Sequence, residues 1–170
     1  MADVDLDLTG RPKDDPVPEY ARRLRTISRV CGGLAGSVAL LVFLNWELTR
    51  EAGGRPIPGL PPAVPLSMSM LAAVLILLSS RLRSSILRRA FPRSAVLEPN
   101  PDAVLAAYGR ATLLSFAVLE TAAILGLVVS LSTGAASYGI VLCVVSLFGM
   151  LTRWPKAGEV DRLLRGRASP

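Results

Sequence analysis

Apolar residues are gathered into four long runs along the chain of 170 residues, and polar residues fill the segments between them. The runs cover 27–44, 63–80, 111–131 and 135–152, and none contains more than one charged residue. A helix needs about 20 apolar residues, within a range of about 17–25, to cross the hydrocarbon core of a bilayer. The pattern therefore predicts an all-α integral membrane protein with four transmembrane helices in two hairpins.

Flanking residues extend some of these helices beyond the runs. Pro18 and Glu19 suit a first helical turn, so we expect a helix to begin there and to carry the first span, about 27–46. Pro101 is expected to begin one long helix that includes the third span. Residues 81–91 either extend the second span or form a short helix at the head-group boundary.

The same pattern divides the chain into three parts. Residues 1–17 are expected to be a disordered cytoplasmic tail because they are polar and rich in proline, while their alternation of acid and aliphatic residues also fits a short strand or a docking peptide. Residues 18–154 form the transmembrane domain. Residues 155–170 form a second cytoplasmic tail, with a short amphipathic helix over 159–165.

The 19 basic residues are shared unequally among the segments outside the runs. Six lie before or at the start of the first run, two in the loop 45–62, six in the segment 81–110, none in the turn 132–134, and five after the fourth run. Basic flanks stay on the cytoplasmic side of a membrane. With an even number of spans, both termini are therefore expected in the cytoplasm, and the expected location is a bacterial inner membrane.

Composition narrows the class of protein further. Hydrophobic residues make up 51% of the chain and the mean hydropathy is +0.47, which excludes a soluble enzyme domain and a wholly disordered chain. The net charge of +6 is explained by contact with anionic lipid head groups, and no nucleic-acid partner is expected. The predicted head-group residues lie in the loop after the second span: Arg81, Arg83, Arg88 and Arg89.

Cysteine and histidine usage gives no sign of a metal or a cofactor. The two cysteines, Cys31 and Cys143, lie inside apolar runs without C-x-x-C spacing, and the chain contains no histidine. The sequence also contains no phosphate-binding glycine loop and no pair of nucleophile and base. We therefore expect no metal site, no cofactor and no enzymatic activity.

Glu120 is the residue most suggestive of chemistry, because it lies at the centre of the third run. A charge at this depth costs about 2.5–3.5 kcal/mol on insertion scales, and burial favours the neutral carboxyl. Counting 1.5 Å per residue along each helix places Ser37, Ser69 and Cys143 at a similar depth. We expect Glu120 to face the bundle interior in this layer, either as a structural group, as a proton- or ion-binding carboxyl, or as a contact for a ligand.

Small residues recur at helix-packing intervals in two of the runs. Spacings of four residues let helix backbones approach closely within lipid. The first span contains two such pairs, Gly32 with Gly36 and Gly33 with Ser37. The third span has a stripe of the same kind, formed by Ala122, Gly126 and Ser130. These patterns favour assembly as a homo-oligomer or within a larger membrane complex.

Residues 118–129, VLETAAILGLVV, resemble the carboxylate helix of the proteolipid (c-type) subunits of rotary ATPases. The resemblance implies a proton- or Na⁺-binding Glu120. It covers about a dozen residues, and the preceding run lacks the closely repeated glycines of those subunits. The similarity is therefore a local helix pattern.

A broader resemblance covers roughly residues 65–165. Glu120 in the third span, the turn Leu131-Ser132-Thr133-Gly134 and the charged tail after Trp154-Pro155 are similar to a group of small bacterial four-span membrane proteins without an assigned activity. It implies membership of that group. The leading expectation for function is a non-catalytic subunit or assembly partner of a membrane complex, and the alternative is a proton- or ion-binding, transporter-like protein that uses Glu120.

Overall fold

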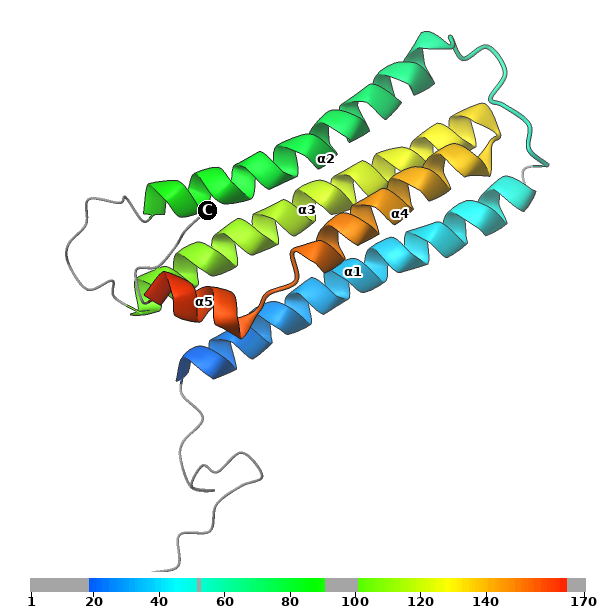
Figure 1. The fold of residues 1–170 in the computed structure, drawn as a ribbon. Coiled ribbons are helices and arrows are strands. Elements are labelled where there is room, and N and C mark those ends of the chain that lie inside the picture. The colour runs from blue at the N-terminus through cyan, green and yellow to red at the C-terminus, as the bar shows by residue number, and fades with distance from the viewer. Residues whose placement is uncertain (1–18, 52, 91–100, 165–170) are drawn as a thin grey trace, which may run out of the picture.

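The protein is described by a computed structural model that covers residues 19–51, 53–90 and 101–164. Every regular element within these residues is a helix, which confirms the all-α prediction (Figure 1). The expectations for the tail 1–17 and for Pro18 lie outside the described residues. The helices are α1 (Glu19–Glu51), α2 (Ala63–Ala90), α3 (Pro101–Thr133), α4 (Ala136–Thr152) and α5 (Ala157–Leu164).

Three of the helices, α1, α2 and α3, are long and apolar enough to cross a membrane, and α4 is a shorter apolar helix of 17 residues. Large apolar side chains point outward along them. Leu77 is 71% exposed and Leu66 63% exposed on α2, and Phe148 is 67% exposed on α4. An apolar surface this extensive is suited to lipid and not to water. The length, composition and apolar outer surface of these helices suggest a membrane protein.

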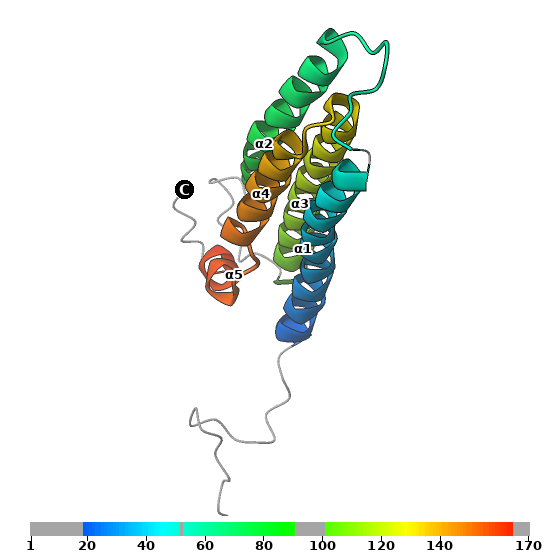
Figure 2. The ribbon, with the colours of Figure 1, turned by 90° about the vertical axis from the view of Figure 1, so that its right-hand side faces the viewer.

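Helix α3 is the centre of the fold and packs against each of the other long helices. Helices α1 and α4 lie on one side of α3 and also contact each other, whereas α2 packs on the opposite side of α3 (Figures 1 and 2). Of the two expected hairpins, α3 and α4 form a closely packed pair. Helices α1 and α2 are antiparallel but are separated by α3, so they do not form a packed hairpin.

The helix ends agree with the expected extensions. Helix α2 continues to Ala90 without interruption, which selects the extension of the second span over a separate helix at the head-group boundary. Helix α3 runs as one helix from Pro101. At the far end of the bundle, Gly134 turns the chain between α3 and α4 with a φ of 70°, a conformation that favours glycine.

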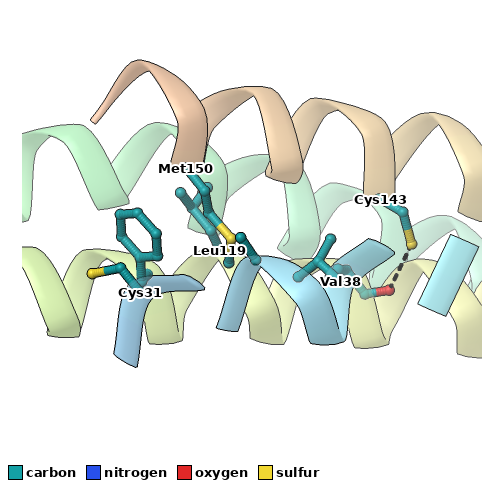
Figure 3. Packing of buried hydrophobic residues seen from close by; sticks show 8 residues of the cluster. Cys31, Val38, Leu119, Cys143 and Met150 are labelled. Carbon is teal, nitrogen blue, oxygen red and sulfur yellow. Dashed lines mark hydrogen bonds between the residues drawn. The ribbon is translucent and has the colours of Figure 1, made fainter. Parts of the chain in front are cut away.

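The apolar core lies between α1, α3 and α4. Cys31, Val38, Leu119, Cys143 and Met150 are completely buried there and interlock along the helix axes (Figure 3). A second, smaller apolar cluster joins α5 to the bundle, where Val160 packs against Leu105 and Tyr108 of α3. The first cluster holds the three helices that carry the candidate site.

Candidate functional site

Glu120 of α3 contacts Ser37 of α1, as the depth calculation expected. The Ser37 Oγ lies 2.5 Å from the Glu120 Oε1 and 2.7 Å from the carbonyl oxygen of Leu34. A serine hydroxyl has a single proton, so it cannot donate fully to both acceptors. Its hydroxyl therefore lies between two acceptors, the carboxyl of Glu120 and the carbonyl of Leu34, and joins α1 to α3.

The two other expected partners of Glu120 do not join this layer. The Ser69 hydroxyl donates to the carbonyl of Pro65 in its own helix, at 2.9 Å. The Cys143 thiol points to the Ala123 carbonyl of α3, at 3.5 Å (Figure 3). Equal depth therefore brings together only one of the three expected pairs, because the direction of a side chain around its helix is a separate variable.

Glu120 and Ser37 are both half-buried and lie where α1 meets α3. The residues of α3 next to Glu120 on the outer side, Ala117 and Thr121, are exposed. We call this contact, together with the exposed residues that lie beside it on the two helices, the α1–α3 seam; it consists of Gly33, Gly36, Ser37, Ala117, Glu120 and Thr121. The expectation that Glu120 faces the bundle interior is therefore only partly met, since its carboxyl lies at the edge of the interior and not within it.

The small-residue stripe of α3 lies against α4. Ala122 is completely buried, and a Cβ at Gly126 would lie 2.9 Å from the Cβ of Leu142. The Ser130 hydroxyl accepts from the backbone N–H of Gly139, at 2.8 Å. This stripe therefore serves contact between α3 and α4 within one chain.

The glycines of α1 behave differently from that stripe. A Cβ at Gly32 would contact Trp154, at 3.7 Å, so this glycine packs against its own chain. A Cβ at Gly33 or at Gly36 would meet no atom within 4 Å among the described residues, and both positions are exposed. The fold therefore uses one of the three glycines and leaves two on the α1–α3 seam.

A polar contact near the far end of the bundle was not anticipated from the sequence. Asn45 of α1 is completely buried and packs against Gly139 of α4 and Ser130 of α3. Its Oδ1 accepts from Thr49, at 3.3 Å, while its Nδ2 is buried without a hydrogen-bond partner among the described residues. Asn45 lies one residue beyond the first apolar run, and its position there is the only signal that the sequence offers.

A second unanticipated cluster lies at the opposite, basic end of the bundle. Arg83 of α2 donates to Glu159 of α5 at 2.8 Å, and its guanidinium carbon lies 5.5 Å from the ring centre of Tyr108. Tyr108 is completely buried on α3 and donates to the same Glu159 oxygen at 2.9 Å. Three helices are thus joined by one ionic and hydrogen-bonded group.

This cluster separates Arg83 from the other predicted head-group residues. The Arg83 side chain is only 15% exposed, whereas Arg81, Arg88 and Arg89 are exposed on α2. The exposed three are placed as head-group contacts require. Arg83 instead faces the protein.

Arg153 follows directly after α4, and its side chain points into the bundle. Its Nη1 donates to Ser79 of α2 at 2.6 Å and to Ser115 of α3 at 3.2 Å. Burial, together with the charge of Arg83, lowers the pKa of Arg153. The serines within the apolar runs were the only hint of this contact in the sequence.

Comparison of the chain with protein-family models, curated proteins and solved structures finds no match. Within the described residues, no group of three or more His, Cys, Asp or Glu side chains is arranged to hold a metal ion. The chemistry that the site offers is therefore that of one half-exposed carboxyl, two open glycines and a basic cluster.

Proposed function

We propose that the protein is a non-catalytic subunit or assembly partner of a complex in a bacterial inner membrane. In this proposal four helices cross the bilayer and both termini are cytoplasmic, with the basic end of the bundle at the cytoplasmic face. The unequal distribution of arginine and lysine supports this orientation. The resemblance of residues 65–165 to small four-span bacterial proteins supports the same class.

The observation that carries the proposal is the pair of open glycines on the α1–α3 seam. Gly33 and Gly36 cost helix stability relative to alanine, about 1 kcal/mol each in water-exposed helices, and a Cβ at either would have no neighbour within 4 Å in the described part of the chain. Small residues at the surface of a membrane helix allow a second helix to approach closely. The most direct use of these two positions is therefore contact with a helix of another chain.

Glu120 adds a polar group to the same surface. Among the described residues its Oε1 contacts Ser37, and its Oε2 forms no hydrogen bond. A polar atom in hydrocarbon without a partner is costly. A helix seated against Gly33 and Gly36 would bring donors within reach of this oxygen, so the carboxyl would fix the position of that helix.

The test replaces each open glycine by leucine. Gly33→Leu and Gly36→Leu are expected to leave the fold of the single chain intact, because a Cβ at either position meets no atom within 4 Å among the described residues and both positions are exposed. They are expected to block the close approach of a second helix, so that the protein from gently solubilised membranes migrates at the size of the single chain. The measurement is native electrophoresis together with light scattering in mild detergent.

The matched control is Ala73→Leu, which enlarges an exposed small residue on α2, away from the seam. This variant is expected to keep the wild-type assembly size. The proposal fails if the wild-type protein already migrates as a single chain, or if all three variants reduce the size equally.

A second candidate function, proton or ion binding by Glu120, is favoured by the geometry of Ser37. The hydroxyl lies 2.5 Å from the Glu120 Oε1 and can both donate and accept a hydrogen bond, so it places a second oxygen ligand beside the carboxyl. The local resemblance to proteolipid subunits supports the same use. In this candidate the proton, or a cation in its place, is held between Glu120 and Ser37.

Two substitutions at Glu120 separate the candidates. Glu120→Gln keeps hydrogen bonding to Ser37 but cannot titrate, whereas Glu120→Leu removes both properties. If assembly and cellular function persist in Glu120→Gln and are lost in Glu120→Leu, the carboxyl acts as a structural group of the subunit. Loss of cellular function in both variants, with assembly intact in Glu120→Gln, supports ion binding.

A further inference from the structure

We propose that the basic end of the bundle contains a specific binding site for a phosphate group, formed by Arg83 and Arg153 between α2 and the end of α4. The site is separate from the α1–α3 seam. Its failure would therefore leave the proposed assembly role untouched.

The side chain of Arg153 points into the bundle. Arginines at the ends of membrane helices normally extend toward the water and keep their charge solvated. Arg153 does the reverse, because it reaches Ser115, which is the fifth residue of the third apolar run. At 1.5 Å per residue, its guanidinium lies about 6 Å inside the start of that run.

The inward-facing guanidinium of Arg153 has only uncharged partners. Within the described residues Arg153 donates to two neutral hydroxyl groups, those of Ser79 and Ser115, and forms no ion pair. A half-buried cation held only by hydroxyls retains a large part of its desolvation cost. It is stabilised when an anion approaches its remaining N–H groups.

The positive charges of Arg83 and Arg153 exceed the negative charge beside them. Ser79, which accepts from Arg153, lies one helical turn before Arg83 on α2, and among the described residues the single carboxylate that contacts either arginine is Glu159. Two guanidinium groups thus share one negative charge. The Arg83 Nε is in addition buried without a hydrogen-bond partner among the described residues. The cluster has more donors and more positive charge than its own acceptors balance.

A phosphate group supplies what the cluster lacks. It has a negative charge and several acceptor oxygens, and guanidinium groups bind it through paired N–H donors. Two sources have this chemistry, namely the head group of an anionic phospholipid in the adjacent leaflet and a soluble phosphate. Basic pockets between membrane helices are a known setting for the lipid form.

The test compares probes on the wild-type protein in uncharged detergent. The probes are phosphatidylglycerol, zwitterionic phosphatidylcholine and inorganic phosphate, and the readouts are lipid retention by native mass spectrometry and the midpoint of thermal unfolding. We expect retention of phosphatidylglycerol and a raised midpoint relative to phosphatidylcholine. Stabilisation by inorganic phosphate alone, without preference for phosphatidylglycerol, would assign the same site to a soluble phosphate. If neither probe differs from phosphatidylcholine, the proposal is wrong.

Variants then locate the site. Arg153→Gln is expected to weaken retention by about tenfold or more, the range for loss of a charge-assisted hydrogen bond. Arg50→Gln is the matched control, since it removes an exposed arginine from the last turn of α1, at the opposite end of the bundle, and is expected to leave retention unchanged. Equal loss in both variants would show general attraction to the membrane and would overturn the proposal. If Arg153→Gln does not fold, Arg83→Gln and the wild-type probe comparison provide the same decision.

Discussion

Replacement of Gly139 by alanine is expected to lower the free energy of unfolding by about 3 kcal/mol, the upper part of the usual range for overpacking a core. The added Cβ would overlap with Asn45 Nδ2 and Ser130 Oγ, and it would lie 2.5 Å from the carbonyl oxygen of Gly126. The Gly126 oxygen belongs to the backbone of α3 and the Ser130 hydroxyl is held by the N–H of Gly139. Neither can move aside without separating α3 from α4.

The expected result is measured as the loss of the cooperative unfolding transition, or a lowered midpoint, for the purified variant in mild detergent. Gly33→Ala is the matched control, because it makes the same chemical change in a helix where the Cβ meets open space. That variant is expected to unfold at or above the wild-type midpoint, since alanine favours a helix over glycine. A Gly139→Ala protein as stable as Gly33→Ala would show that α4 does not pack on α3 in the way described here.

The helices of this protein could be predicted from the sequence because they follow mainly from the length of the apolar runs. Within lipid every backbone polar group has to be paired inside its own helix, so long apolar runs indicate helices directly. The residues that favour the start of a helix also predicted α3 correctly, since this helix begins at Pro101. The packing of α2 on the far side of α3 was not predictable in this way, since apolar composition does not specify which neighbour a helix chooses.

The candidate site shows the same division between what a sequence specifies and what it leaves open. Depth along each helix follows from residue number, and it correctly brought Ser37 level with Glu120. The direction around the helix follows from packing, and it turned Ser69 and Cys143 to backbone carbonyls elsewhere. A single sequence therefore specifies the depth of a residue along its helix but not the direction of its side chain around the helix.

The polar contacts at the basic end of the bundle were missed for a related reason. Arg83 and Arg153 were read as basic flanking residues, because arginine near a helix end normally faces the lipid head groups. Their actual direction depends on partners that are remote in the sequence, such as Ser115 for Arg153 and Glu159 for Arg83. The charge of a flanking residue therefore does not specify the contacts of that residue.

Replacement of Glu159 by alanine is expected to release α5 from the bundle. The carboxylate accepts from Arg83 at 2.8 Å and from Tyr108 at 2.9 Å, so its removal leaves a guanidinium that is 15% exposed and a buried hydroxyl without this acceptor. Because Glu159 itself is 38% exposed, the cost lies below that of a fully buried pair, at about 2 kcal/mol.

The measurement is amide hydrogen exchange, which reports local opening separately from global unfolding. A cost of about 2 kcal/mol corresponds to roughly thirtyfold faster exchange in α5, since about 1.4 kcal/mol is a factor of ten. Exchange in the central part of α3 is expected to stay at the wild-type rate. Arg162→Ala is the matched control, because it removes an exposed charge from the same helix.

The two outcomes separate the forces that hold α5. Val160 packs against Leu105 and Tyr108, and this apolar contact is unchanged in the Glu159→Ala variant. If α5 exchanges as slowly as in the wild-type protein, the apolar contact alone fastens the helix and the ionic cluster contributes little. If exchange accelerates in Glu159→Ala and not in Arg162→Ala, the carboxylate is the group that couples α5 to α2 and α3. Added phosphatidylglycerol is then expected to slow the exchange again in part, because a phosphate group would restore a negative charge beside Arg83.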